Sequence, residues 1–336
     1  MTIWPPRLHA EDCAQAHFWL LLKTAYFWGA GDVATRSVFS ALCVSVSVFL
    51  QWLLAVPLPR YVNEARFFMA KTAKTAQANP GATISIPDGS GNILQTDSLL
   101  APHDWDADFR NALCAALDLG KDSIRSWHDL AHFDVIVTNP PFGSKIPVKG
   151  AVLEQFALAR IWHQDKKTGH WLPTEKLQSS VPPEILFIER CTQFLKEGGR
   201  MGIVLPDSIL GSPGLGYVRE WILRNHRVVA SLDLHADTFQ PHNGTQTSVL
   251  ILRKKTKDER IQEATTGAMP PYNVFMAMIE RVGHDKRGNT LFLRDRDGNE
   301  ILEDSGDGRR AKVIDDQTRD VPAIFTKWMK EEGLSW

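Results

Sequence analysis

The feature that most constrains the fold is a short apolar run that stops abruptly at two prolines. Residues 133–138 read FDVIVT, an almost continuous apolar stretch that is typical of a buried parallel strand. The run ends at Asn139-Pro140-Pro141-Phe142, where proline cannot continue the hydrogen bonds of a strand. Ligands of open α/β sheets bind beyond the carboxyl ends of such strands, so this tetrapeptide is the first candidate for a functional site.

Strands and helices alternate on both sides of this run. We predict helices over 184–196 and 217–225, and strands over 82–87, 92–98, 133–138, 200–206, 226–234 and 247–255. Two other segments are expected to be a polar helical stretch over 104–130 and a long, irregular functional loop over 144–182. The alternation predicts an α/β fold with a doubly wound, mainly parallel sheet.

Changes in composition along the chain predict three parts. Residues 1–64 form an atypical apolar N-terminal segment, 65–256 the core, and 257–336 a polar C-terminal extension that bears a small hairpin. The stretch 38–58 is nearly all apolar and long enough to span a bilayer, which needs about 20 residues. We interpret it first as sequence foreign to the fold, read from a truncated or frame-shifted gene, then as unusual core, and last as a membrane anchor.

Charge and cysteine content bound the function only loosely. A formal net charge of −1 neither supports nor excludes a nucleic-acid partner, because a basic cleft can be hidden in a neutral total. The four cysteines form no C-x-x-C pair, and the histidines lack metal-ligand spacing. We therefore expect no metal site and a reducing, cytoplasmic location.

The residues of the tetrapeptide suit chemistry on the amino group of adenine. The side-chain oxygen of Asn139 and the carbonyl of Pro140 can accept both amino hydrogens, at angles fixed by the proline rings. Phe142 offers a face on which a flipped base can stack. The alternative is a turn in which Pro140 and Pro141 merely end a strand.

Longer stretches around the tetrapeptide resemble the N6-adenine DNA methylases typified by the modification subunits of type I restriction systems. The resemblance covers 133–143, 182–210 and 235–255, and loosely 274–288. It implies a Rossmann-like fold, S-adenosylmethionine as cofactor, and site-specific methylation of adenine in DNA within a restriction–modification or related defence system. It also implies a specificity subunit as a partner, with a restriction subunit as a further candidate.

The same resemblance assigns cofactor residues less completely. Asp97 stands where the family's acidic residue contacts the cofactor adenine, although a turn or helix-capping aspartate would look the same. The nearest match to the family's Gly-rich cofactor turn is the Gly29-x-Gly31 pair, so the N-terminal part is expected to be truncated or divergent. We interpret 253–255 (Arg-Lys-Lys) as a solvated strand end rather than a phosphate contact.

Three other functions stay open. The first alternative is an inactive remnant that binds DNA or a partner subunit. The other two are methylation of RNA and methylation of a protein glutamine, because Asn-Pro-Pro sites serve planar amino and amide nitrogens alike.

Overall fold

The computed structural model describes residues 2–4, 20–21, 96–142, 147–241, 243–267, 270–304 and 310–334. Four features predicted from the sequence lie outside these residues: Gly29, Gly31, the apolar stretch 38–58 and the strand 82–87. None of the helices in the described part of the chain combines the length and the apolar character needed to cross a bilayer.

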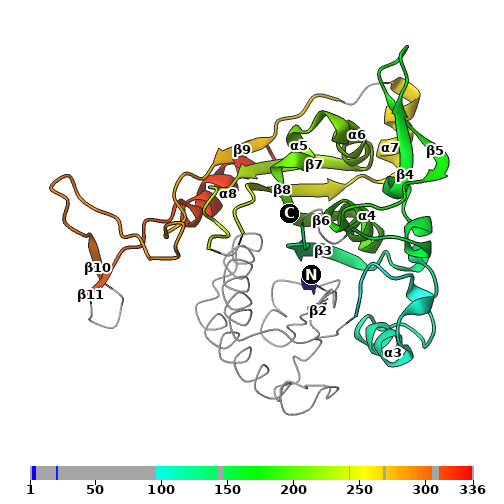
Figure 1. Ribbon diagram of the computed structural model, residues 1–336, viewed down its shortest axis with the longest axis horizontal. Coiled ribbons are helices and arrows are strands. Elements are labelled where there is room, and N and C mark those ends of the chain that lie inside the picture. Colours follow the sequence, from blue (N-terminus) through cyan, green and yellow to red (C-terminus); the bar gives the residue numbers. More distant parts are fainter. Residues whose placement is uncertain are drawn as a thin grey trace. The chain divides into compact units, whose positions relative to one another are not determined.

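Figure 1 labels most of the elements of the described residues. The helices are α3 (Ala107–Ala116), α4 (Pro183–Phe194), α5 (Asp207–Gly211), α6 (Gly216–Asn225), α7 (Lys257–Thr266) and α8 (Val321–Glu331). The short 3-10 turns are η1 (Pro102–Asp104), η2 (Trp127–Asp129), η3 (Ala151–Gln155), η4 (Ala157–Ala159), η5 (Pro213–Leu215) and η6 (Gln317–Arg319). The strands are β1 (Thr2–Trp4), β2 (Leu20–Leu21), β3 (Phe133–Thr138), β4 (Arg160–Gln164), β5 (Trp171–Leu177), β6 (Leu195–Pro206), β7 (His226–Asp233), β8 (Thr247–Lys254), β9 (Phe275–Met278), β10 (Leu302–Asp304) and β11 (Arg310–Lys312).

A seven-stranded mixed sheet organises the chain, in the order β2-β1-β3-β6-β8-β7-β9. β3 pairs with β6 in parallel and β7 with β9 in parallel, whereas β1 runs antiparallel to both β2 and β3. The predicted α/β class is therefore confirmed, with a mixed sheet. The doubly wound, mainly parallel arrangement stays a prediction.

The chain divides into two compact units. The first comprises Met1–Val228 and Ile251–Pro270, and the second comprises Val229–Leu250 and Pro271–Trp336. The second unit has an aromatic core in which Phe275 of β9 contacts Phe325 and Trp328 of α8, with ring centroids 5.2 and 5.5 Å apart.

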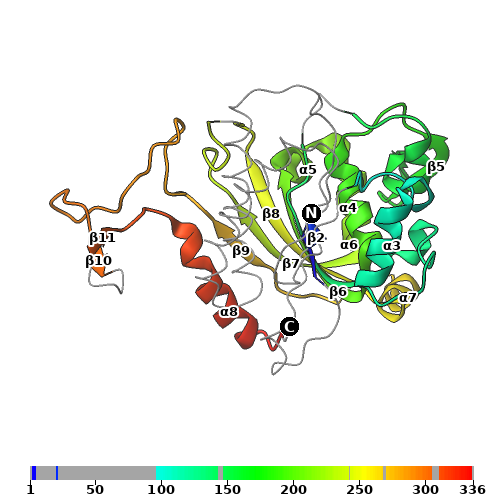
Figure 2. The ribbon, with the colours of Figure 1, turned by 90° about the horizontal axis from the view of Figure 1, so that it is seen from below.

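The core of the first unit is built around α4. Every residue of this helix is buried, because it lies between the sheet and the segments that precede it in the chain. Pro183 fits the first helical turn, where its missing N–H would have no partner. Figure 2 shows α4 and α6 side by side along one face of the sheet. The helix runs directly into β6, whose Gly198 adopts a positive φ of 74°.

Several predicted elements hold and others are wrong. The strands predicted over 133–138, 226–234 and 247–255 and the helix over 184–196 are confirmed, with ends shifted by up to two residues. The prediction of a strand over 92–98 is wrong in its described part, since residues 96–98 form coil and the start of a turn.

The helical prediction over 104–130 is also largely wrong. The one α-helix described there is α3, which ends at Ala116, two residues before Asp118 adopts a left-handed backbone conformation with a φ of 55°. Asp106 caps the start of α3, where its carboxylate accepts hydrogen bonds from the N–H groups of Asp108 and Phe109.

The expected irregular loop over 144–182 is instead partly ordered as an antiparallel hairpin of β4 and β5. Its inner face packs on α6, because Trp162 and Trp171 both contact the ring of Tyr217, with centroids 5.8 and 6.1 Å away. The carboxylate of Glu220 accepts hydrogen bonds from the backbone N–H of Trp171. This tertiary contact, which no local pattern reveals, orders the segment.

The C-terminal extension contains the expected hairpin, β10–β11, but also two helices that the sequence interpretation missed. Helix α7 begins at a capping box between Thr256 and Glu259. Helix α8 carries a proline in its first turn.

Candidate active site

The predicted tetrapeptide follows β3, a largely buried strand of the first unit. Ile136 and Val137 of β3 are almost fully buried, and Thr138 pairs with Ile203 of β6. Beyond the strand, the side chain of Asn139 is half-buried and Pro140 is buried. Asn139 thus lies directly beyond the carboxyl end of β3, which is the position expected from the sequence.

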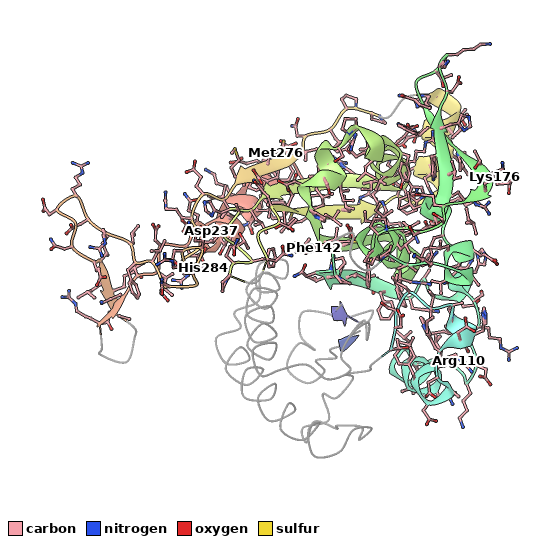
Figure 3. All side chains as sticks on the ribbon, viewed as in Figure 1. Arg110, Phe142, Lys176, Asp237, Met276 and His284 are labelled. Atoms are coloured by element: carbon pink, nitrogen blue, oxygen red, sulfur yellow. The ribbon has the colours of Figure 1, made fainter. Side chains whose placement is uncertain are left out.

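The next two residues turn outward from this position. Pro141 is exposed and Phe142 is half-buried. Phe142, which is labelled in Figure 3, follows Asn139 by three residues.

The amide oxygen of Asn139 is the most informative atom of the site. Asn139 Oδ1 is buried and has no hydrogen-bond donor among the described residues. The hydroxyl of the neighbouring Thr138 is likewise buried and unpaired within that part of the chain. An unpaired buried acceptor costs about 1–3 kcal/mol, so it persists where another group supplies the donor.

Asp97 lies in a tight turn ahead of α3. Its carboxylate accepts a hydrogen bond from the N–H of Leu99 at 3.0 Å, and its carbonyl accepts one from the indole N–H of Trp105 at 3.1 Å. Burial raises the pKa of Asp97 above its ordinary value, and the N–H of Leu99 and the nearby guanidinium of Arg190 oppose that rise. The turn is therefore rigid, and the carboxylate keeps acceptor capacity beyond its one bond to Leu99.

Asp97 and Asn139 share no hydrogen bond. Gly29 and Gly31, which were predicted to complete the cofactor site, lie outside the described residues. Within the described ranges, no group of three or more His, Cys, Asp or Glu side chains is placed to hold a metal ion.

Two charged residues that the sequence interpretation missed are buried side by side on α4. Glu189 is 7% exposed and Arg190 is 0% exposed. The carboxylate of Glu189 accepts hydrogen bonds at 2.8 Å from the N–H groups of both Ala157 and Leu158. An adjacent acid and base in the middle of an otherwise apolar helix was the sequence signal that could have revealed them.

The interpretation of 253–255 as a solvated strand end is wrong. Arg253 makes a two-pronged ion pair with Glu259, at 2.6 and 3.0 Å. The ammonium of Lys254 donates to the carbonyls of Thr192 and Leu195 at the end of α4. Lys255 is 2% exposed and donates to the carbonyl of Leu223 at the end of α6. The two lysines are used inside the fold because helix carboxyl ends leave carbonyls without partners, whereas Arg253 is used in an ion pair.

The geometry defines a class of site. A buried strand of an α/β sheet ends at an Asn-Pro-Pro turn whose amide oxygen has no donor among the described residues, and an aromatic ring follows. Such a site is built to accept hydrogen bonds from a planar amino or amide group.

Residues 103–297, more than half of the chain, match the N-6 DNA Methylase family, and the chain belongs to this family. The family resemblance predicted from residues 133–143 and the segments after them is confirmed. No curated protein sequence matches the chain.

Three solved structures illustrate what the chain is similar to. A class I S-adenosylmethionine-dependent methyltransferase from Listeria monocytogenes is 14% identical over 74% of this chain and 67% of its own, with a TM-score of 0.34. A modification subunit of a type I restriction enzyme from Vibrio vulnificus YJ016 is 14% identical over 69% of this chain and 43% of its own, with a TM-score of 0.32. The M protein of the type I restriction enzyme EcoKI is 17% identical over 56% of this chain and 36% of its own, with a TM-score of 0.29.

The chain thus spans less than half the length of the two type I proteins. The TM-scores are too low to add to the family assignment, which stands on the match over 103–297.

Proposed function

We propose that this chain is a methyltransferase that transfers a methyl group from S-adenosylmethionine to the N6 amino group of adenine in DNA. The observation that carries the proposal is the buried oxygen of Asn139 at the end of β3, which has no donor within the described part of the chain, in a member of the N-6 DNA Methylase family.

The reaction requires the amino nitrogen of adenine to act as a nucleophile although its lone pair is delocalised into the ring. Asn139 Oδ1 and the carbonyl of Pro140 accept the two amino hydrogens, which turns the lone pair out of the ring plane. The prolines fix the backbone angles, so the acceptors are already oriented when the base arrives. Asn139 Oδ1 lacks a donor among the described residues, so an incoming amino group displaces no protein bond there.

The target base must leave the double helix to reach this site. Flipping it out costs a few kcal/mol, and stacking on the ring of Phe142 returns about 1–3 kcal/mol. The half-buried ring suits this role because one part of it is anchored in the protein and another part is accessible.

S-adenosylmethionine, when bound, supplies a methyl group that is already activated by its sulfonium. The described residues fit this cofactor at Asp97, whose half-buried carboxylate has acceptor capacity left for an amino group of the cofactor. The turn holds that carboxylate from the backbone, so binding does not have to order it. Gly29 and Gly31 stay a prediction for the rest of the cofactor site.

We further propose that the protein acts in a restriction–modification or related defence system, with DNA as its substrate. A separate specificity subunit reads the recognition sequence, and a restriction subunit is a further candidate partner. The support is the family match together with the predicted resemblance to type I modification subunits.

The test is methyl transfer by the purified chain from labelled S-adenosylmethionine to adenine-containing duplex DNA. We expect transfer to N6 and a loss of at least about 100-fold in Asn139→Ala, the scale for removing one preorganised hydrogen-bonding group. Asn225→Ala, which removes a half-buried side-chain amide that donates to the carbonyl of Trp221 within α6, is the matched control and keeps its activity.

Parallel reactions with RNA and with glutamine-containing peptides separate the alternatives. Transfer to either in place of DNA would replace the proposed substrate. Cofactor binding that leaves Asn139→Ala as active as the wild type would remove the proposed role of the tetrapeptide. An absence of both binding and transfer would identify the chain as an inactive remnant.

A further inference from the structure

A buried arginine outside the tetrapeptide makes several polar contacts to three segments of the first unit. The guanidinium of Arg190 on α4 is fully buried and lies 4.9 Å from the ring centroid of Phe156. Its Nη1 donates to Gln193 Oε1 at 2.7 Å. Its Nη2 donates to Gln155 Oε1 at 2.5 Å and, at 3.1 Å each, to the carbonyls of Leu99 and Leu100.

These last two carbonyls belong to the turn that presents Asp97. Leu99 O also accepts a hydrogen bond from Gln155 Nε2 at 2.8 Å. Asp97 O accepts from Leu100 N at 3.2 Å and from the indole of Trp105 at 3.1 Å. The carbonyls of Asp97, Leu99 and Leu100 are therefore all engaged, and Arg190 holds two of them from a helix about 90 residues further along the chain.

A purely structural need does not account for a charged group here. Burying a cation costs several kcal/mol, and a neutral donor such as a glutamine side chain could satisfy the same carbonyls. A guanidinium adds what an amide lacks, a fixed planar fork of donors and a positive charge near the Asp97 carboxylate. Arg190 and Asp97 interact electrostatically in the sense that favours the ionised carboxylate.

We propose that Arg190 is a positioning residue for the cofactor, which fixes the 97–100 turn so that the Asp97 carboxylate keeps its direction toward S-adenosylmethionine. This inference rests on the proposed function. Helix α4 continues into β6, and β6 pairs with the strand that carries Asn139. One helix thus sets both the turn of the cofactor carboxylate and the strand next to the catalytic loop.

The test measures cofactor affinity directly, by calorimetry with S-adenosylmethionine and with S-adenosylhomocysteine. Arg190→Gln is expected to raise Kd about tenfold or more. The coupling free energy between contacting groups is about 0.5–3 kcal/mol, and about 1.4 kcal/mol corresponds to a tenfold change in Kd. Gln155→Met, a milder change that removes one donor to Leu99 O and one acceptor of Arg190 Nη2, is expected to raise Kd by about threefold. In the Asp97→Ala variant, adding Arg190→Gln should raise Kd by less than about a further twofold, because the carboxylate that Arg190 positions is gone.

Glu189→Gln is the matched control. Glu189 is the neighbouring buried charge on the same helix, but it holds the N–H groups of Ala157 and Leu158 rather than the 97–100 turn. Its loss should lower Tm while Kd stays within about twofold of the wild type.

The outcomes distinguish a failure of this inference from a failure of the proposed function. A wild-type chain that binds neither ligand overturns the proposed function and this inference together. If the wild type binds and Arg190→Gln binds equally well, or if its effect adds fully to that of Asp97→Ala, the inference alone is wrong. Should Arg190→Gln fail to fold, Gln155→Met decides in the same way, and an unchanged Kd overturns the inference.

Discussion

Replacing Asn139 with leucine should stabilise the protein while it abolishes methyl transfer. Leucine has nearly the shape of asparagine but lacks the acceptor that is buried at this position without a donor among the described residues. An unpaired buried polar group costs about 1–3 kcal/mol, and an apolar group of the same shape avoids that cost. For a chain of 336 residues 1 kcal/mol corresponds to about 1.5 °C, so Tm should rise by roughly 1–5 °C.

Asn225→Leu provides the comparison, because it makes the same substitution at another half-buried asparagine. Asn225 Nδ2 donates to the carbonyl of Trp221 at 2.9 Å at the end of α6. Losing this bond should cost about 1 kcal/mol and lower Tm by about 1.5 °C, with methyl transfer retained. Thermal denaturation followed by circular dichroism gives both Tm values, and labelled S-adenosylmethionine with duplex DNA gives the transfer rates.

The opposite signs of the two stability changes are the core of this prediction. If Asn139→Leu lowers Tm as much as Asn225→Leu does, its oxygen has a structural partner and the argument from an unpaired acceptor fails. If the variant is stabilised but still transfers methyl groups, the acceptor is genuinely unpaired and yet has no role in the reaction.

Three further changes test the structural account. Burial lowers the pKa of His226 to about 3, so between pH 6.5 and 3 the unfolded chain binds more protons than the folded one. Stability should fall as pH drops through this window, by up to about 1.4 kcal/mol per pH unit, and His226→Gln should flatten that slope in urea titrations. Lys254→Met should lower the free energy of unfolding by about 1–3 kcal/mol yet leave the salt dependence of DNA binding unchanged, because its ammonium bonds α4 carbonyls rather than phosphates. In Gly199→Ala the new Cβ would lie 2.9 Å from a backbone oxygen, so a loss of about 1–3 kcal/mol is expected in thermal denaturation. Gly211→Ala meets nothing within 4 Å and should be neutral or slightly stabilising.

The sequence predicted those elements whose side-chain pattern is decided locally. The strand 133–138 and the helix 184–196 have apolar patterns that only one type of element can bury, and both are confirmed. The helix α7 was also predictable, because Thr256 and Glu259 form a capping box at its start.

The β4–β5 hairpin was not predictable in the same way. It is ordered by Trp162 and Trp171 packing on Tyr217 of another element, so its stability comes from tertiary contact. Two residues beyond the end of α3, Asp118 adopts a left-handed conformation, which aspartate tolerates but does not require. These features follow from the packed chain rather than from the local sequence.

At the site, the residue types indicated the chemistry, but the sequence did not show which polar atoms have hydrogen-bond partners. The sequence singled out Asn139 by its position after a predicted strand and Asp97 by the family resemblance. It also weighed 253–255 as a phosphate contact. The structure separates these cases because the cations of 253–255 have intrachain partners, whereas Asn139 Oδ1 is buried without one among the described residues.

The state of bonding also separates two kinds of polar residue near the proposed reaction. A polar group that holds the fold has several partners, as the two terminal nitrogens of Arg190 have on two segments and on its own helix, although Arg190 Nε has none among the described residues. A polar group available to a ligand has unused acceptor capacity, as Asn139 Oδ1 has and as the Asp97 carboxylate has beyond its bond to Leu99. Removing a group with several partners lowers stability, whereas a buried acceptor without a donor lowers stability while it is present. It follows that substitutions of Arg190 should lower both Tm and cofactor affinity, whereas Asn139→Leu should lower activity and raise Tm.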